Sequence, residues 1–378
     1  MTSSDNQLTP ADTTVHETPI GSGVAHIATS VQAIRPPSET ELLRVEDLSV
    51  SFPTDDGLVK AVRGVSYSLR EREVLGIVGE SGSGKSVSSM AVMGLLPKSA
   101  QVSGRILFRG KDVLKMTPKE QRSLRGRKIG MIFQDPMTAL NPVYTVGDQL
   151  AEAVRSHEAV AKKVALKRAE EMLDLVGIPQ PKQRLRNYPH EFSGGMRQRA
   201  MIAMAVINNP DVIIADEPTT ALDVTVQAQI LEKLIEVKDA VNAAIVLITH
   251  DLGVVAGMAH RVLVMYAGRA VEIGDVDSVF YRPRMPYTGG LLGSIPALEG
   301  HSERLRPIKG APPSLINLPP GCPFSPRCPL ATDVCRQVEP PLVETDERYH
   351  VAACHHWDQM AEADDPTAFF RTESETVR

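Results

Sequence analysis

The stretch from Gly79 to Ser86 has the residue types and the spacing that bind nucleotide phosphates. Its sequence, GESGSGKS, matches the P-loop pattern G-x-x-x-x-G-K-[ST]. In this pattern the glycines let backbone N–H groups curl around the phosphates, the lysine reaches the β- and γ-phosphates, and the final hydroxyl ligates Mg²⁺. We therefore expect a nucleotide–Mg²⁺ site formed by Gly79, Glu80, Ser81, Gly82, Ser83, Gly84, Lys85 and Ser86.

The residues around this motif predict the elements that position it. The apolar run from Val74 to Val78 predicts a strand before the loop, and Ser86 to Leu96 predicts a helix after it, which Pro97 would end. The positive end of that helix would point at the phosphates. A chance Gly/Ser turn does not require this strand–loop–helix order, so we favour a phosphate cradle.

Two carboxylates follow a second apolar run, Val212 to Ala215. Phosphoryl transfer depends mainly on positioning and charge stabilisation. Asp216 would accordingly hold Mg²⁺ through its water shell, and Glu217 would polarise the attacking water. Considered alone, the pair is equally well explained as an acidic strand end that caps the next helix.

A third feature is Ser193-Gly194-Gly195, which precedes a helical run from Ala200 to Ile207. Free N–H groups, a hydroxyl and the helix dipole make such a start an anion site. The alternative is an ordinary N-cap with a flexible turn. Because the chain already has one phosphate cradle, we expect this second one to face a different nucleotide.

The order of six motifs along the chain resembles the ATP-binding cassette (ABC) family. Besides the three features above, the chain carries Phe133–Pro136 (FQDP), Ala221–Asp223 (ALD) and Ile248–His250 (ITH). The resemblance covers roughly Leu42 to Gly274. It implies an α/β fold, with a P-loop ATPase core, an antiparallel β subdomain and an inserted helical subdomain.

One motif also narrows the sub-family. Phe192–Met196 (FSGGM) departs from the family's usual Leu-Ser-Gly-Gly-Gln and is similar to the variant in the ATPase subunits of bacterial oligopeptide and dipeptide importers. The phosphate-facing Ser193 and Gly195 are retained, so the departure does not imply an inactive site. Other similar stretches are Gln134–Val146, Asp216–Gln227, Met285–Leu292 and the Cys-rich C-terminal part. The resemblance therefore implies a subunit that hydrolyses ATP to energise the import of oligopeptides or dipeptides.

The resemblance also implies roles for residues at the nucleotide. Gln134 would sense Mg²⁺ and the γ-phosphate and couple the site to the membrane partner. His250 would contact the γ-phosphate and fix the water together with Glu217, and Lys85 would complete the catalytic set. Phe52 would stack on adenine, although an aromatic residue at a strand end also fits a place in the core.

A second set of residues would face the ATP of an opposite subunit. Ser193 and Gly195 would contact its γ-phosphate, with Gly194 between them, and Asp223 would lie at the dimer seam. The implied partners are a second homologous ATPase subunit, a different chain in similar importers, then two permease subunits and an extracytoplasmic peptide-binding protein. The chain would be peripheral, on the cytoplasmic face of the plasma membrane.

Composition bears on the rival functions. A net charge of −5 and 4 % aromatic residues argue against nucleic-acid binding. No run of about 18 apolar residues lacks a charge, so no membrane span is expected, and the N-terminus shows no secretion signal. Two alternatives remain: another cargo, such as a nickel chelate, glutathione or a sugar, or a soluble ABC ATPase acting on DNA or the ribosome. The latter usually carry two cassettes or a long coiled-coil insertion, and this chain shows neither.

The 378 residues divide by composition and periodicity. The N-terminal part is rich in Ser, Thr and Pro and is expected to be disordered. Alternation in Leu48–Phe52 and Val65–Leu69 predicts antiparallel strands, with a turn at Asp55–Gly57. We expect a disordered tail at 1–40, an ABC nucleotide-binding domain at 41–274 with its helical subdomain at about 120–207, a peptide-importer-type C-terminal extension at 275–357 and a disordered tail at 358–378.

Further elements follow from apolar patterns. Core strands are predicted at Asp211–Asp216, Ala244–Thr249 and Arg261–Tyr266. Lys119–Lys128 holds five basic residues in ten; these could contact a membrane surface or nucleic acid, but we favour a solvated helix face. Helical spacing connects Val160, Val164, Met172, Leu173 and Val176.

All four cysteines lie in the Pro-rich C-terminal part, namely Cys322, Cys328, Cys335 and Cys354. A cytosolic location argues against disulfides, whereas four thiolates could hold Zn²⁺ or a [4Fe–4S] cluster. The spacings lack the C-x₂-C knuckle usual for zinc, and the resemblance to importers favours the cluster; zinc and free thiols are the alternatives. His355 and His356 could substitute as ligands. Such a site would be structural.

Overall fold

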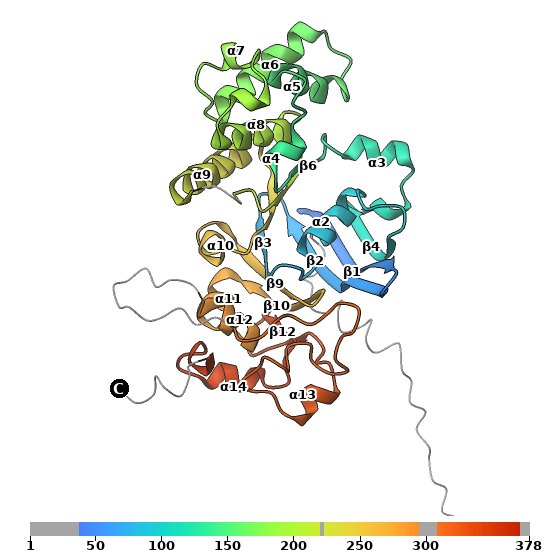
Figure 1. Cartoon of the computed structure of the whole chain (residues 1–378), viewed down its shortest axis with the longest axis vertical. Coiled ribbons are helices and arrows are strands. Elements are labelled where there is room, and N and C mark those ends of the chain that lie inside the picture. Colours follow the sequence, from blue (N-terminus) through green and yellow to red (C-terminus); the bar gives the residue numbers. More distant parts are fainter. Residues whose placement is uncertain (1–37, 220–222, 295–307, 371–378) are drawn as a thin grey trace, which may run out of the picture.

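The computed structural model describes residues 38–219, 223–294 and 308–370. The predicted motif residues Ala221 and Leu222 lie outside these ranges, as do residues 1–37 of the tail expected at 1–40 and residues 371–378 of the tail expected at 358–378. The described part is elongated: the helices of residues 146–206 gather at one end and the C-terminal residues 308–370 at the other (Figure 1). Among its helices, none is long and apolar enough to cross a membrane.

An eight-stranded mixed sheet forms the centre, in the order β11-β12-β10-β9-β3-β8-β7-β6. Strands β9, β3, β8, β7 and β6 pair in parallel, and the remaining three pair antiparallel. Strands β7, β8 and β9 confirm the three predicted core strands. The bounds are β3 (Val74–Val78), β6 (Ile129–Ile132), β7 (Val212–Asp216), β8 (Ala244–Ile248), β9 (Arg261–Tyr266), β10 (Arg269–Asp275), β11 (Val343–Glu344) and β12 (Val351–Ala352).

The two faces of this sheet are covered by two separate apolar clusters. In β3, Leu75 and Ile77 belong to one cluster, and Val74 and Val78 belong to the other. This split follows from the two-residue period of a strand. A parallel strand covered on both faces reads as a continuous apolar run, which is why VLGIV was recognisable as a strand in the sequence.

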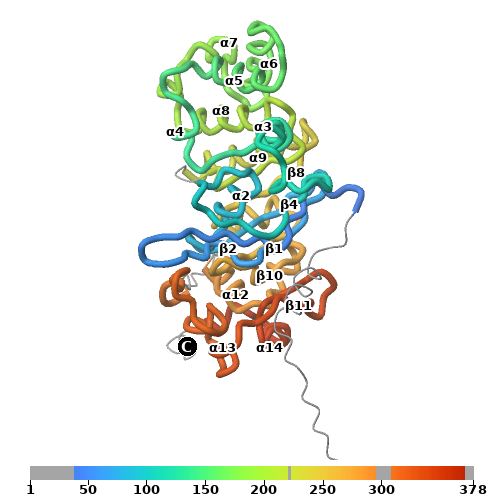
Figure 2. Tube along the Cα trace, turned by 90° about the vertical axis from the view of Figure 1, so that its right-hand side faces the viewer, coloured from blue at the N-terminus to red at the C-terminus, as the bar shows by residue number. Residues whose placement is uncertain are grey.

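A second, antiparallel sheet has the order β2-β1-β4-β5. Thr54 pairs with Gly57 across the two-residue turn Asp55–Asp56, which confirms the predicted hairpin. Figure 2 shows this sheet crossing the middle of the molecule. Its bounds are β1 (Glu41–Thr54), β2 (Gly57–Arg70), β4 (Gln101–Phe108) and β5 (Lys111–Asp112).

The helix after the P-loop, α2 (Lys85–Met93), is shorter than predicted. Gly94 adopts φ 60° and ψ 37°, and the N–H groups of Gly94 and Leu95 donate to the carbonyls of Ala91 and Met90. This left-handed glycine cap closes the helix. The prediction that Pro97 ends it was therefore wrong.

The region expected to be mainly helical is so, with one exception. Strand β6 lies within it and pairs with the distant β7. Its four residues are too few to reveal a period in the sequence. Helix α3 buries none of its residues, as expected of a solvated face. The bounds are α3 (Pro118–Leu124), α4 (Pro136–Ala139), α5 (Val146–Arg155), α6 (Lys162–Leu175), α7 (Pro181–Arg184) and α8 (Gly194–Val206), with short 3₁₀ turns η1 (Val113–Lys115) and η2 (Pro189–Glu191).

Helix α6 confirms the predicted helical spacing but with a different buried stripe. Ala165, Ala169 and Leu173 form the inner face, whereas Val164 is exposed. Val164 is about 100° away from Ala165 around the helix, so it falls off this stripe. Alanines decide the packing here, and they carry a weaker apolar signal than valine.

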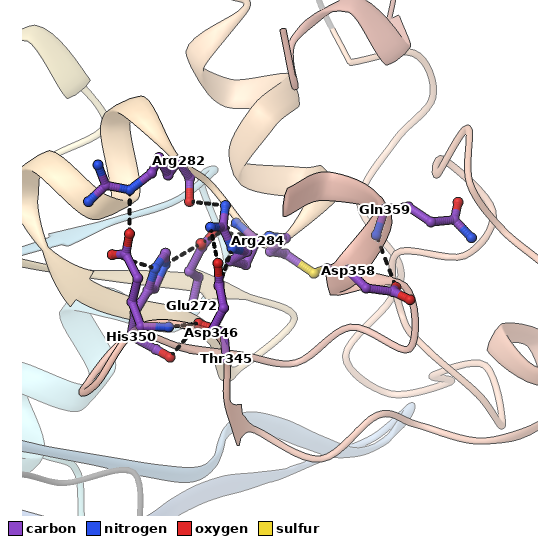
Figure 3. Close-up of polar contacts among 10 residues, drawn as sticks. Glu272, Arg282, Arg284, Thr345, Asp346, His350, Asp358 and Gln359 are labelled. Atoms are coloured by element: carbon purple, nitrogen blue, oxygen red, sulfur yellow. Dashed lines mark hydrogen bonds and ion pairs between the residues drawn. The ribbon is translucent and has the colours of Figure 1, made fainter. Parts of the chain in front are cut away.

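The C-terminal part continues the core. Strand β12 extends the central sheet by pairing with β10. The ion pair Arg284–Asp346 and the hydrogen bond between His350 and Glu272 join the C-terminal part to the core (Figure 3). The prediction of a disordered tail from residue 358 onward was wrong for residues 358–370, because Met360 is buried and Phe370 packs on Phe324. The bounds are α9 (Val224–Val241), α10 (Leu252–Met258), α11 (Val276–Tyr281), α12 (Pro286–Leu292), α13 (Asp333–Gln337), α14 (Trp357–Glu362) and η3 (Ala368–Phe370).

Candidate active site

The P-loop connects β3 to α2 with little room for side chains. Gly79 and Gly84 have φ of 150° and 100°, and a Cβ atom on them would lie 2.2 Å from the Met265 carbonyl oxygen and 2.3 Å from the Ala61 carbonyl oxygen. Both positions therefore require glycine. The loop backbone is pressed against β9 and β2, which fixes its curvature.

Lys85 is buried inside this loop. Its Nζ donates to the carbonyl oxygens of Gly79 (2.7 Å) and Glu80 (3.0 Å). Burial lowers the pKa of the Lys85 ammonium, and the nearby carboxylates of Glu217 and Asp216 partly offset this. The Lys85 ammonium is held by loop carbonyls, and phosphate oxygens could take their place as its partners. This arrangement suits the role predicted for the lysine.

Ser86 and Asp216 lie side by side, where α2 begins and β7 ends. The Ser86 Oγ donates to Asp216 Oδ1 at 2.9 Å. Burial raises the pKa of the Asp216 carboxyl, an effect that the Ser86 hydrogen bond opposes and the charge of Glu217 reinforces. A hydroxyl and a carboxylate that meet beside a phosphate loop are the oxygen donors that Mg²⁺ prefers, so the donor set fits that ion.

The Glu217 carboxylate contacts two other predicted residues, Gln134 and His250. Its Oε2 accepts a hydrogen bond from Gln134 Nε2 at 2.9 Å, and its Oε1 lies 3.4 Å from His250 Nδ1. These residues follow β7, β6 and β8, which are neighbours, so the carboxyl edge of the parallel sheet brings them together. Glu217 also has a φ of 47°, a strained value for a residue other than glycine and one found at functional sites.

The remaining predicted residues lie elsewhere. Ser193, Gly194, Gly195 and Asp223 line one hollow, formed by the start of α8, the start of α9 and the loop after α6. Ser193 caps α8 by accepting from the Met196 N–H (3.3 Å), and Asp223 likewise caps α9. Phe52 is half-buried on β1 and packs against an apolar cluster. The structure therefore forms two groups of predicted residues. The P-loop cluster consists of Gly79–Ser86 with Asp216, Glu217, Gln134 and His250. The signature hollow is lined by Ser193, Gly194, Gly195 and Asp223.

Sequence reasoning missed two residues that touch the P-loop. Arg327 forms a two-point ion pair with the Glu80 carboxylate, and the Tyr287 hydroxyl accepts from the Glu80 N–H at 2.8 Å. Arg327 lies between Pro326 and Cys328, in a segment without periodicity. No local pattern signals such a long-range contact.

All four cysteines line one small cavity, together with His355 and His356. Burial raises the pKa of the Cys328 and Cys354 thiols to about 12. Within the described residues, no group of three or more His, Cys, Asp or Glu side chains is arranged to hold a metal ion. The donor types thus fit a thiolate-bound metal, whereas the arrangement of the side chains does not form a ready site.

Two family models match the chain: "ABC transporter" over residues 62–220, and "Oligopeptide/dipeptide transporter, C-terminal region" over residues 271–335. The dipeptide transport ATP-binding protein DppD of Bacillus subtilis (strain 168) is 56% identical over 325 residues, 85% of this chain and 96% of the relative. The oligopeptide transport ATP-binding protein OppD of Escherichia coli (strain K12) is 53% identical over 303 residues, 80% and 90%. OppD of Mycobacterium tuberculosis is 57% identical over 317 residues, which are 83% of this chain but only 51% of that relative.

A solved structure adds the fold. The dimeric ATP-binding cassette MJ0796, in a post-hydrolysis state bound to ADP and Pi, matches with a TM-score of 0.56 and 25% identity, covering 62% of this chain and 99% of that chain. ATP and Mg²⁺ are typical of this family of ATPases. The chain therefore belongs to the ABC transporter family, as an ATP-hydrolysing cassette that carries the oligopeptide/dipeptide transporter C-terminal region.

Proposed function

We propose that this chain hydrolyses ATP to energise the import of oligopeptides or dipeptides through a membrane permease pair. The observation that carries the proposal is the presence, in one chain, of the Glu217 cluster and the oligopeptide/dipeptide C-terminal region. Relatives named for dipeptide and oligopeptide transport match over most of its length.

In this proposal the P-loop cluster divides the chemistry among its residues. The P-loop N–H groups and Lys85 bind the phosphates. Ser86 and Asp216 would hold Mg²⁺, and Gln134 would sense Mg²⁺ and the γ-phosphate. Glu217 orients and polarises the attacking water, and His250 fixes that geometry. The contacts of Glu217 with Gln134 and His250 support this division, because a water-activating carboxylate needs partners that hold its direction. Phe52 would cover the adenine.

The signature hollow would serve a second nucleotide site. Ser193, Gly194 and Gly195 stand at a helix N-terminus, where free N–H groups favour an anion, and Asp223 borders the same hollow. We propose that this hollow faces ATP on a second, homologous ATPase subunit, forming a heterodimer. ATP bound between the two cassettes then favours the closed dimer, and hydrolysis releases it.

The permease contact is proposed at the loop from Gln134 to Val146. Three apolar side chains there are unusually exposed: Met137 (51%), Val143 (70%) and Tyr144 (55%). Exposed apolar groups of this kind favour a protein partner. Because Gln134 at the loop's start touches Glu217, this loop would transmit closure of the ATP site to a helix of one of the two permease subunits. The chain would thus be peripheral, on the cytoplasmic face, with an extracytoplasmic peptide-binding protein delivering the cargo.

The domain division and the cysteine site are also proposals. We propose a nucleotide-binding domain at 41–274, with its helical subdomain at about 120–207, and a C-terminal extension at 275–357. In that extension Cys322, Cys328, Cys335 and Cys354 would hold a [4Fe–4S] cluster, with Zn²⁺ as the alternative. Their shared cavity supports the donor set.

Peptide uptake tests the proposed function. Cells lacking the gene should regain uptake of a labelled di- or oligopeptide with the wild-type gene, and fail to regain it with Glu217→Gln. The control Glu236→Gln alters an exposed carboxylate on α9 and should restore uptake. Normal peptide uptake without the gene, together with loss of nickel or glutathione uptake, would reject the peptide cargo.

A further inference from the structure

Glu80, the second residue of the P-loop, is held on three sides. Its carbonyl oxygen accepts from the Lys85 ammonium at 3.0 Å and from the Ser83 N–H at 3.2 Å, both within the loop. Its N–H donates to the Tyr287 hydroxyl of α12. Its carboxylate pairs with Arg327, 247 positions along the chain. Two of the three anchors therefore come from the region that follows the core ATPase.

The Arg327 side chain is only 4% exposed, and each of its five N–H donors has an acceptor within reach. Two of them make a fork with Glu80, at 2.6 Å (Nη1 to Oε2) and 2.8 Å (Nη2 to Oε1). The others reach the Lys309 carbonyl (Nε, 3.1 Å), the Ile308 carbonyl (Nη2, 3.3 Å) and the Tyr266 hydroxyl (Nη1, 3.3 Å). Such a fork fixes both the position and the orientation of a carboxylate.

An aromatic wall holds Arg327 in place. Tyr266 of β9, Tyr287 of α12 and Phe324 form a three-way contact with ring centroids 4.5 to 5.4 Å apart. The guanidinium carbon lies 5.9 Å from the centroids of both Tyr266 and Phe324. The arginine thus has little freedom to leave Glu80.

We propose that Arg327 is a positioning residue for nucleotide binding, acting through Glu80. It keeps the loop in the shape that receives the phosphates, and it neutralises a carboxylate within the loop that binds a highly charged anion. If Arg327 is removed, Glu80 remains as an uncompensated negative charge beside the polyphosphate. Coulomb repulsion then weakens ATP binding, because partly buried charges are poorly screened. This inference rests on the proposed role of the P-loop in binding ATP.

The same region provides a matched control. Arg284 is equally buried, at 4% exposure, and makes an equivalent fork with Asp346, with both distances 2.8 Å (Figure 3). This pair joins the start of α12 to the segment before β12, and the hydrogen bonds of Arg284 go to Glu272, Asp346 and Arg282, none of which belongs to the P-loop. Arg284→Gln therefore tests what loss of a buried arginine fork does on its own.

The experiment measures MgATP affinity of the full-length chain by calorimetry, and KM and kcat in the purified transporter. Arg327→Gln should weaken ATP binding and raise KM by about 10- to 100-fold, the range expected when one uncompensated, partly buried negative charge faces the polyphosphate. The kcat should change by less than about 3-fold, since Glu217 and His250 are untouched. Arg327→Lys keeps the charge but not the fork, so its ATP affinity should lie between those of the wild type and Arg327→Gln.

The decisive variant is the double substitution Arg327→Gln with Glu80→Gln. It removes the uncompensated carboxylate, so it should recover most of the affinity that Arg327→Gln loses, a coupling that a double-mutant cycle quantifies. The proposal is overturned if Arg327→Gln binds ATP like the wild type, if the double variant binds no better than Arg327→Gln, or if Arg284→Gln weakens binding as much. If the wild-type chain itself did not bind ATP, the proposed function would be rejected instead.

Discussion

Glu217 concentrates the predicted chemistry in one side chain. Gln134 and His250 both contact its carboxylate, and its backbone is left-handed where β7 ends. Two contacts that restrict rotation of the carboxylate are a form of preorganisation, which electrostatic catalysis requires. The predicted roles of all three residues stay predictions until a variant separates binding from hydrolysis.

Glu217→Gln makes that separation. The amide keeps the size of the side chain and can still contact Gln134, but it cannot accept a proton from water. ATP hydrolysis in the assembled transporter should fall by about 10²- to 10⁴-fold while ATP binding persists. Gel filtration with ATP should show a trapped dimer with the partner ATPase. Turnover at the wild-type rate would contradict the assignment.

At the scale of elements, the sequence predicted what is local and missed what is not. Strand β3, the P-loop and α2 lie within twenty residues, and each carries its own signal: an apolar run, glycines and a helix start. Strand β6 carries no comparable signal, because its four residues are stabilised by pairing with β7, about 80 positions away. The end of α2 was misplaced for a related reason, since Gly94 in a left-handed cap outweighs the more obvious Pro97.

Two P-loop glycines should differ sharply when they are replaced by alanine. Gly82 and Gly84 both have positive φ, but a Cβ on Gly82 meets no atom within 4 Å, whereas on Gly84 it lies 2.3 Å from the Ala61 carbonyl oxygen. Gly82→Ala should cost about 1 to 2 kcal/mol of unfolding free energy, from backbone strain alone. Gly84→Ala should cost on the order of 3 kcal/mol or more, because β2 or the loop must shift. Urea unfolding measures both, and equal losses would contradict this packing.

The Arg284–Asp346 pair should make stability depend on pH. The Arg284 guanidinium holds the pKa of Asp346 at about 2, below its ordinary value of about 3.9. A lowered folded-state pKa stabilises the protein above the unfolded value, and this contribution disappears as the pH falls from about 4 to 2. Asp346→Asn should therefore destabilise the fold by about 1 kcal/mol or less, since Asp346 is nearly half exposed.

Chemical unfolding at several pH values tests this expectation. The difference between wild type and Asp346→Asn should be constant from pH 7 to pH 5 and shrink below about pH 4. Asp333→Asn, at an exposed surface pair with Arg336, should stay close to wild type. A difference that grew as the pH fell would reverse the sign and contradict the argument.

In the whole molecule, segments that are far apart in the sequence meet at the P-loop and at the central sheet. The C-terminal extension adds β12 to the central sheet and returns Arg327 to the P-loop, so it is continuous with the nucleotide site and not a separate appendage. Family resemblance identified this region in the sequence, but no pattern around Arg327 predicted its contact with Glu80. Clustered cysteines were likewise recognisable by position, while their arrangement around a cavity required the fold.

The proteins that bind this chain in the cell test most directly whether it drives a membrane importer. The full-length protein would be purified from native membranes in mild detergent, and the proteins recovered with it identified by mass spectrometry. Two multispanning permeases and a second ATPase subunit should be recovered, with an associated binding protein that indicates the cargo. Recovery in the soluble fraction with ribosomes or DNA would leave the ATP chemistry in place and contradict the transport function.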